Sequence, residues 1–336
     1  MLGRPSKLIV LFIIMAVVIS VISGFLPNKF LTLINFQSMA SQIPEFGLLA
    51  IAMMITMITG GIDLSVVSIT NLCGVISALI LTKFVSPEVL AAHTGGVIAL
   101  AIMASIVLSV LCGFINGFVV AWFGVPPILA TLGTQGLYLG LAIIITKGYG
   151  IQDFPEKFLF IGSGKIGVIP MPFVIFVFCA LVAALFLSRT KLGLSMNMLG
   201  SNPIASRFSG INNSGVLIRT YMISGLLAGI SSIIMISRVN SMRPGYGYAY
   251  LLQAILVAVL GGTDPSGGYG SILGLAMGIV ILQVLQSGFN ILSFSPFFKK
   301  FIWGVMLLLV MVINVAVAEY QQRVRKTVRG RAGQAE

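Results

Sequence analysis

Residues 48–68 read LLAIAMMITMITGGIDLSVVS, which is an apolar run, a break that carries one carboxylate, and a second apolar run. The break GGIDLS returns near the C-terminus as GGTDPS, so Asp63 and Asp264 occupy the same place in a G-G-x-D-x-S frame. An ionisable group between membrane spans is costly unless it faces protein or water, so it marks a functional or architectural position. A plain turn between two helices also uses Gly-Gly and Asp, and that alternative stays open for each break. The recurrence favours two related halves in one membrane protein.

The composition excludes an ordinary soluble protein. The 336 residues are 58% hydrophobic and 8% charged, whereas about 25% of residues are charged in soluble domains. The net charge of +12 comes mostly from Lys and Arg at the ends of apolar segments and in the tail, which fits membrane topology better than nucleic-acid binding. Three scattered cysteines and one histidine give no disulfide framework and no metal-binding spacing.

Ten segments are apolar and close to the length of about 20 residues that a transmembrane helix needs. They are residues 8–25, 41–59, 64–82, 95–122, 127–146, 170–188, 216–238, 248–262, 270–288 and 298–318. The eighth is short and bounded by glycine, which favours a broken helix over a full span. We therefore predict an all-α polytopic membrane protein, with one transmembrane domain over residues 1–320 and a basic tail over residues 321–336.

An even number of spans places both termini on the same side of the membrane. The tail holds five Lys and Arg residues and the segment over residues 189–219 holds four, so these two stretches carry nine of the chain's 20. Because cytoplasmic loops carry an excess of Lys and Arg, we predict that both termini are cytoplasmic.

The loop over residues 147–169 is polar and Gly-rich and should face outward. Its Gly-Ser-Gly-Lys stretch at residues 162–165 mimics a phosphate-binding loop, but Leu159 stands where glycine is needed and Ile166 follows the lysine. The sequence therefore predicts that this chain does not hydrolyse ATP by itself.

The loop over residues 189–215 should be cytoplasmic and contains GSNPIASRFSGI at residues 200–211. Asn202 suits a helix N-cap, Pro203 suits the first helical position, and Gly210 suits the stop. Ile204 and Phe208, spaced i to i+4, would share one face of this short helix with Arg207 beside them. A helix of two turns is not stable alone, so it should dock either on its own membrane domain or on a partner protein.

Three motifs together resemble one family: ITGGIDLSVVS at residues 58–68, GSNPIASRFSGI at 200–211 and VAVLGGTDPSGGYGSILG at 257–274. They resemble the membrane permeases of bacterial ATP-binding-cassette (ABC) sugar importers of the ribose, xylose, arabinose and galactoside class, also called carbohydrate uptake transporter family 2. The resemblance runs in order from about residue 48 to residue 315.

The resemblance implies a permease in the bacterial inner membrane with three kinds of protein partner. These are a second permease subunit, identical or a sister chain; a cytoplasmic ATP-binding subunit; and a periplasmic or lipid-anchored solute-binding protein. ATP and magnesium would bind the ATPase, and no cofactor is expected on this chain. In the family, the cytoplasmic helix seats in a groove of the ATPase, and the matching positions here are Asn202, Pro203, Ala205, Arg207, Ser209 and Gly210.

The chain departs from the family pattern at three places. Ile204 stands where the family usually has Glu, which predicts an apolar contact in place of a salt bridge to the ATPase. Val67 stands where Gly is common. Leu251 and Gln253 replace an E-x-D pair, so sugar specificity is not carried over, and the chain would be one half of a heterodimer if a sister chain keeps that pair.

Polar residues at membrane depth are candidates for the translocation pathway or its gate. We predict this role for Gly60, Gly61, Asp63, Ser65, Ser68, Asn71, Gln253, Gly261, Gly262, Asp264 and Asn290, with Asn116, Gln135, Gln283 and Gln286 as further polar candidates. For each amide the alternative is a helix–helix hydrogen bond, worth about 0.6 kcal/mol in membranes. We interpret Tyr138, Tyr246, Tyr248 and Tyr250 as interfacial residues rather than sugar-stacking platforms.

Two other function classes stay open. A self-contained secondary transporter or channel would need coupling charges deep in its spans, and Asp63 and Asp264 could serve. A nucleoside permease of the same ABC superfamily would fit the same motifs. A membrane enzyme is disfavoured, because no catalytic His/Asp/Glu cluster or nucleophile motif accompanies the single histidine, His93.

Overall fold

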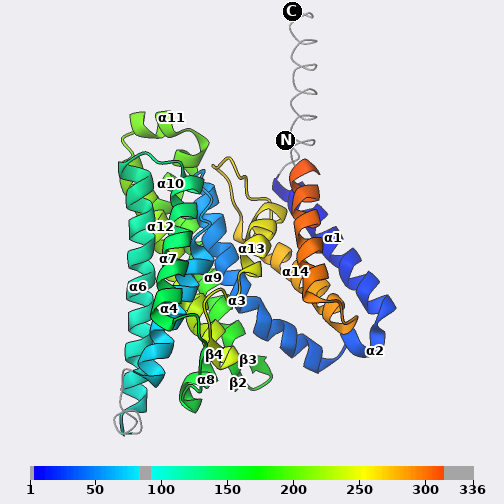
Figure 1. The fold of residues 1–336 in the computed structure, drawn as a ribbon. Helices are drawn as coiled ribbons and strands as arrows, with labels where there is room; N and C mark the ends of the chain where they lie inside the picture. The colour runs from blue at the N-terminus through cyan, green and yellow to red at the C-terminus, as the bar shows by residue number, and fades with distance from the viewer. Residues whose placement is uncertain (1–3, 84–91, 314–336) are drawn as a thin grey trace, which may run out of the picture.

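The computed structural model describes residues 4–83 and 92–313, and it is helical almost throughout (Figure 1). The predicted tail over residues 321–336 lies outside the described residues. The helices in the first half are α1 (Arg4–Phe25), α2 (Pro27–Phe30), α3 (Leu33–Ile58), α4 (Val66–Thr82), α6 (Thr94–Trp122), α7 (Pro127–Thr146) and α8 (Glu156–Ser163). Those in the second half are α9 (Met171–Arg189), α10 (Lys191–Ser201), α11 (Pro203–Phe208), α12 (Asn213–Val239), α13 (Ala249–Leu260), α14 (Ile272–Ile291) and a last described helix, Pro296–Ile313.

Every predicted span coincides with a helix over its described residues, the tenth as far as Ile313, so the all-α polytopic architecture is confirmed. Eight helices are long and apolar enough to cross a membrane, and α4 and α13 are shorter apolar helices. The predicted eighth span is α13, with 12 residues. At 1.5 Å per residue it is about 18 Å long, which is short of the roughly 30 Å of a hydrocarbon core. The expectation that this segment is not a full span is therefore confirmed, although its 12 residues form one continuous helix.

The membrane helices alternate in direction between two ends of the molecule (Figure 1). One end carries α11, the start of α1 and the end of the Pro296–Ile313 helix. The other end carries α2, α8 and two short antiparallel strand pairs, β1 (Ile151–Gln152) with β4 (Ser241–Met242) and β2 (Lys165–Ile166) with β3 (Ile169–Pro170). The first described helix thus begins, and the last described helix ends, on the side of α11, as an even number of spans requires.

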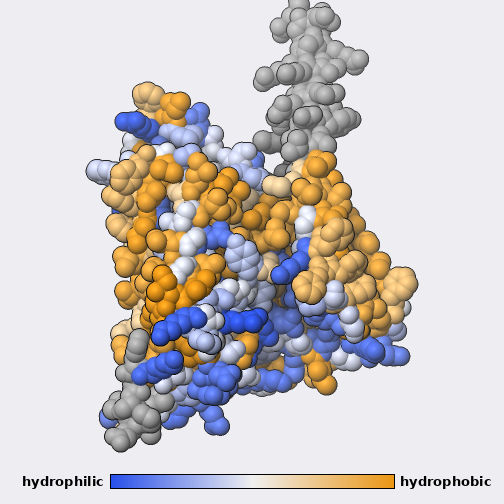
Figure 2. All heavy atoms as spheres, in the orientation of Figure 1, coloured by the Kyte–Doolittle hydropathy of each residue, from blue (hydrophilic) through white to orange (hydrophobic). Residues whose placement is uncertain are grey.

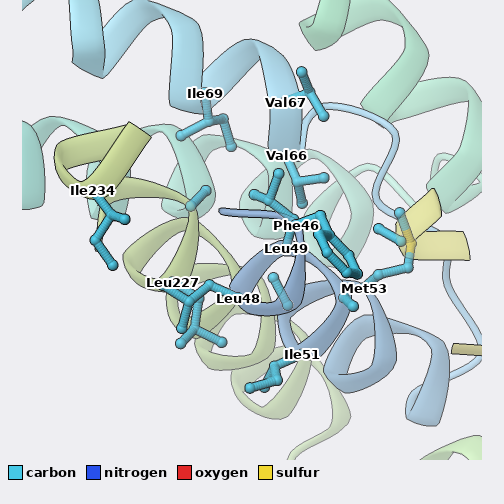
Figure 3. Close-up of a cluster of buried hydrophobic side chains, with 14 of the residues drawn as sticks. Phe46, Leu48, Leu49, Ile51, Met53, Val66, Val67, Ile69, Leu227 and Ile234 are labelled. Carbon is cyan, nitrogen blue, oxygen red and sulfur yellow. The ribbon is translucent and has the colours of Figure 1, made fainter. Parts of the chain in front are cut away.

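Helix α3 forms the centre of the bundle. In its apolar window 89% of residues are buried, against 6% for α1 and for the Pro296–Ile313 helix. It packs on α9, α12, α13 and α14, and Figure 3 shows its Phe46, Leu48 and Met53 among side chains from α4 and α12. A helix that is apolar all round is stable only when it is surrounded, and α3 is surrounded by protein where the outer helices face lipid. Figure 2 shows those outer helices as a broad apolar surface between the two ends.

Close packing between spans depends on small residues, which let two helix backbones approach each other. Helices α6 and α12 approach so closely that a Cβ on Gly225 would overlap the Ser109 carbonyl oxygen. Helices α13 and α14 meet in the same way, because a Cβ on Gly278 would lie 3.1 Å from the Val257 carbonyl oxygen. The G-x-x-x-G pairs at 225/229 and 274/278 therefore both lie at helix–helix contacts.

The two long loops contain more structure than the sequence indicates. The segment over residues 189–215 holds α10 as well as the expected short helix, and α10 begins where the Thr190 hydroxyl accepts a 3.1 Å hydrogen bond from the Gly193 N–H. In the loop over residues 147–169, the phosphate-loop mimic spans the end of α8 and β2. The Gly162 N–H donates to the Ser237 hydroxyl at 2.8 Å, so this glycine serves packing on α12.

We expect Gly225→Ala to destabilise the protein by about 1–3 kcal/mol, because the added methyl group overpacks the contact between α6 and α12. Gly136→Ala in α7 is the matched control, since a Cβ there meets nothing within 4 Å. Both changes gain the same helix propensity, about 1 kcal/mol, so the difference between their thermal unfolding temperatures in detergent isolates the packing term. Equal temperatures would contradict the close contact.

Candidate functional site

Helix α11 has the punctuation that the sequence predicts. The Asn202 side-chain oxygen accepts hydrogen bonds from the Ile204 and Ala205 N–H groups, each at 3.0 Å. Pro203 is the first helical residue, and Gly210 follows the helix with a φ of 80°. Asn202 thus satisfies two of the backbone donors that a helix start leaves unpaired, which fixes the helix without help from apolar packing.

The apolar face of α11 points away from the rest of the chain. Ile204 is 70% exposed and Phe208 is 89% exposed, whereas Ser206 on the opposite side is buried. The Ser206 hydroxyl donates to the Asn213 side-chain oxygen at 2.8 Å, and the Asn213 amide donates to the Pro203 carbonyl at 2.8 Å. Polar bonds to the start of α12 therefore hold α11 in place and leave its apolar pair free to contact another protein.

Both G-G-x-D-x-S breaks lie at the end of the molecule that carries α11, and each ends its helix with the same cap. After α3, the Gly60 N–H donates to the Met57 carbonyl and the Gly61 N–H to the Thr56 carbonyl. After α13, the Gly262 N–H donates to the Val259 carbonyl and the Thr263 N–H donates to the Ala258 carbonyl. These are Schellman caps with a left-handed glycine. The left-handed residue is the first glycine of one motif, Gly60, and the second glycine of the other, Gly262.

The two aspartates make the same local bond in different surroundings. Asp63 Oδ1 accepts from the Ser65 N–H at 3.0 Å, and Asp264 Oδ1 accepts from the Ser266 N–H at 2.9 Å. Asp63 is fully buried, whereas Asp264 is exposed near α11. The interpretation of Asp264 as a charge deep in the spans is therefore wrong, because the second break turns outward to the surface.

Asp63 is the centre of a buried hydrogen-bond network. Its Oδ1 also accepts from the Ser65 hydroxyl at 2.7 Å, and its Oδ2 accepts from the Ser224 hydroxyl at 2.9 Å. The Asn116 amide donates to the Ser65 hydroxyl at 2.7 Å, and the Tyr138 hydroxyl donates to the Asn116 oxygen at 3.3 Å. The network joins the start of α4 to α6, α7 and α12, and no basic side chain in the described part of the chain pairs with Asp63. Tyr138 was interpreted as interfacial, which is wrong, because it is buried in this network.

Three backbone segments meet beside α11 in what we call the glycine junction, formed by residues 58–60, 200–201 and 267–268. The Gly268 N–H donates to the Ile58 carbonyl at 2.8 Å. A Cβ on Gly267 would lie 2.8 Å from the Gly60 nitrogen and 2.9 Å from the Gly200 oxygen, and a Cβ on Gly200 would overlap the Ile58 oxygen. Both G-G-x-D-x-S loops therefore contact the last turn of α10, immediately before α11. Sequence reasoning missed Gly200 as a contact, although the residue opens the GSNP motif.

A buried ion pair that sequence reasoning missed lies nearer the opposite end. Arg238 Nε on α12 donates to Glu45 Oε1 on α3 at 2.5 Å, and the Tyr250 hydroxyl on α13 donates to Glu45 Oε2 at 2.6 Å. Glu45 is fully buried. In the sequence, this ion pair was indicated by the carboxylate of Glu45, which lies inside the predicted span 41–59. Tyr250 was interpreted as an interfacial residue, which is wrong, because it is a partner of Glu45.

The predicted pathway residues are spread over several helices and over the two breaks. Ser68 and Asn71 are buried three residues apart on α4, Gln253 is buried on α13, and Asn290 is exposed near the end of α14. The Asn71 amide donates to the Tyr246 carbonyl at 2.9 Å. The Ser68 hydroxyl and one side-chain oxygen each of Asn71 and Gln253 have no hydrogen-bond partner in the described part of the chain. Each unpaired buried group costs about 1–3 kcal/mol. We therefore expect these atoms to form hydrogen bonds with groups outside the described chain or in another conformation of it.

Comparison with known proteins gives a consistent result. A family model described as "Branched-chain amino acid transport system / permease component" matches residues 35–311. The ribose import permease protein of Escherichia coli (strain K12) is 33% identical over 306 residues, which cover 90% of this chain and 92% of that protein. The D-allose transport system permease protein of the same strain is 28% identical over 309 residues, covering 92% and 91%. The autoinducer 2 import system permease protein of Yersinia enterocolitica is 30% identical over 294 residues, covering 84% and 86%. No solved structure matches the chain significantly.

We expect Asp63→Ala to destabilise the protein by about 2–4 kcal/mol, because it leaves three buried donor bonds without their acceptor. Asp264→Ala is the matched control, since it removes the same bond to the backbone two residues on, at an exposed position. Thermal unfolding of the two purified variants in detergent measures the difference. If both variants unfold at the same temperature, the network around Asp63 is not structural.

Proposed function

The chain belongs to the family described as branched-chain amino acid transport system / permease component, and from that membership we propose a specific role. It is the membrane-spanning subunit of an ATP-driven, binding-protein-dependent importer that carries a sugar or a similar small polar solute across the bacterial inner membrane. The chain itself performs no chemistry on the solute. ATP and magnesium bind a separate cytoplasmic ATPase, and no cofactor binds here.

The observation that carries this proposal is the exposed apolar pair on α11. A Phe side chain that is 89% exposed beside an Ile that is 70% exposed is unfavourable in water and favourable in a protein interface. Asn202, Pro203, Ala205, Ser209 and Gly210 shape and end this helix, and Arg207 adds a cation beside Phe208. We assign α11 as the helix that docks in the ATPase.

The glycine junction supplies a route from α11 to the spans. Because Gly200 contacts both residue 58 and residue 268 through backbone atoms, a displacement of α11 pushes on the end of α3 and on the loop that leads into α14. Backbone contacts cannot yield by changing a rotamer, so the three segments move together. Closure of an ATPase dimer then becomes a rigid-body rearrangement of the spans around α3.

The proposed solute is small and uncharged. Relatives at 28–33% identity are named for import of ribose, allose and autoinducer 2, and the candidate polar groups in the spans of this chain are mainly amides and hydroxyls. Gln253 stands where the resemblance leads one to expect an acidic residue, which favours neutral over charged cargo. A nucleoside also presents hydroxyls and amide-like groups, so a nucleoside permease of the same superfamily is the second candidate.

The partners and the orientation follow from the same proposal. A second permease subunit, identical or a sister chain, completes the pathway, and the solute-binding protein docks on the end that carries α8 and the strand pairs. The end that carries α11 faces the cytoplasm together with both termini. The lipid bilayer surrounds the outer helices, and no nucleic acid is involved.

A self-contained secondary carrier has less support. It needs titrating charges within the spans, and Asp264 is exposed while both oxygens of Asp63 accept hydrogen bonds from serine groups. Such a carrier also has no use for an apolar helix presented to a partner.

We expect Arg207→Glu combined with Phe208→Ala to abolish ATP-dependent uptake and release the ATPase during affinity purification, because truncating a central interface aromatic costs about 2 kcal/mol or more. Phe178→Ala is the control, since Phe178 on α9 is also an exposed aromatic, with 67% of its surface accessible. Mass spectrometry of the bound proteins and uptake into vesicles are the measurements. A wild-type chain that moves solute without ATP or partners would identify a secondary carrier instead.

We expect Gly200→Ala to leave the ATPase bound but lower uptake per ATP hydrolysed by about tenfold, a loss of about 1.4 kcal/mol in coupling. The methyl group would separate α10 from the Ile58 carbonyl while α11 keeps its cap. Gly95→Ala, where a Cβ meets nothing within 4 Å, is the control. Uptake and ATP hydrolysis measured on the same vesicles report the ratio. An unchanged ratio would show that the junction does not transmit the motion.

A further inference from the structure

Helix α14 carries a polar face that the proposed function leaves without a role. Gln283, Gln286, Ser287 and Asn290 follow one another at i, i+3, i+4 and i+7 in a helix that is otherwise mainly apolar. This spacing places the four side chains on one side of the helix. A continuous polar face over two turns is costly within a membrane, so it marks contact with something other than lipid.

The polar face runs from the end opposite α11 to the middle of the bilayer. Asn290 is exposed, and its side-chain oxygen accepts a 2.5 Å hydrogen bond from Lys299 Nζ. Gln283 lies eight residues before the last residue of α14, Ile291. At 1.5 Å per residue that is about 12 Å along the axis. Gln283 is therefore near the middle of α14 and is fully buried.

The deepest amides on this face lack the partners that buried amides normally have. Neither the oxygen nor the nitrogen of the Gln283 side chain has a hydrogen-bond partner in the described part of the chain. The Gln253 amide on α13 makes only a long bond of 3.4 Å to the Gln286 oxygen, and its own oxygen is unpaired. Native proteins pair nearly all buried polar atoms or supply water to them. A helix–helix hydrogen bond explains Ser287, which donates to Asn35 at 2.8 Å, but it does not explain Gln283.

The packing of α13 on α14 allows these amides to be uncovered. The glycine contacts between the two helices lie toward the α11 end, where Gly261 abuts Gly274 and Leu275, and where a Cβ on Gly278 would lie 3.1 Å from the Val257 oxygen. Gln253 and Gln286 lie further toward the other end. A rotation about the glycine contacts therefore separates the helices at the amides.

We propose that Gln253, Gln283 and Gln286, the α13–α14 amide cluster, form a transient mid-membrane binding step for a neutral polyhydroxylated solute. The inference rests on the proposed function and adds the residues that handle the cargo. Each amide offers donors and an acceptor, which matches a hydroxyl group that does both. The cluster contains no charged side chain, so it offers an ionic solute nothing to offset the cost of desolvation. Uncharged hydrogen bonds are also weak enough to release the solute.

The test is uptake by the complete importer in vesicles, with radiolabelled D-ribose and D-allose as probes. Gln283→Leu and Gln253→Leu should each lower the rate of ATP-dependent uptake by about tenfold. The unfolding temperature should stay the same or rise, because leucine removes a buried group that had no partner. Gln42→Leu is the matched control, since the Gln42 amide on α3 is already bonded to Ser38 at 2.9 Å, and it should leave uptake unchanged.

Gln283→Asn is a further variant, because it keeps a shorter amide at the same place and should restore part of the uptake. Wild-type uptake in both leucine variants would overturn the inference while the proposed function stands. A fall in uptake that is matched by a fall in unfolding temperature would also overturn the inference, because the amide would then serve to stabilise the fold. If the wild-type complex accumulates neither probe with ATP, the proposed sugar import fails, and this inference fails with it.

Discussion

The hydrogen bond from the Gly268 N–H to the Ile58 carbonyl, 2.8 Å long, is the contact on which the rest of the arrangement depends. Ile58 is the last residue of the central helix α3, and Gly268 belongs to the loop between α13 and α14. Gly200, in the last turn of α10, packs against the same two backbone groups. Backbone N–H and C=O groups inside a membrane protein must find their hydrogen-bond partners within the protein. Here that requirement joins the end of α3 and the loop between α13 and α14 to α10, which leads into the docking helix α11.

The central helix is held by polar bonds at both ends and by apolar packing between them. Toward α11, the Asp63 network ties the break after α3 to α6, α7 and α12. Toward the other end, Glu45 joins α3 to Arg238 and Tyr250. Buried charged groups add geometric specificity more than net stability. Hydrogen bonds therefore join helices α4, α6, α7 and α12 to one another and to the two ends of α3.

The contacts between α13 and α14 differ from those that join α4, α6, α7 and α12 to α3. The glycine contacts of this pair lie on the side of the glycine junction, and in the described structure both polar atoms of the Gln283 side chain and the Gln253 side-chain oxygen have no hydrogen-bond partner. Rigid packing with satisfied polar groups resists motion, whereas incompletely satisfied groups favour other conformations. A transport subunit needs both kinds of region, one to receive the force and one to change its contacts with the solute.

The sequence by itself determined the span positions, the shortness of α13 and the cap of α11, because these follow from local periodicity and backbone chemistry, whereas the exposure of the apolar face of α11 came from the structure. Only the tertiary structure decided that Asp63 is buried while Asp264 is exposed, that Glu45 pairs with Arg238 across 193 positions, and that Gly200 touches both breaks. A six-residue motif fixes its own turn and cap through bonds that reach at most a few residues. Its burial depends on which distant helices pack around it, and that is set by the whole chain.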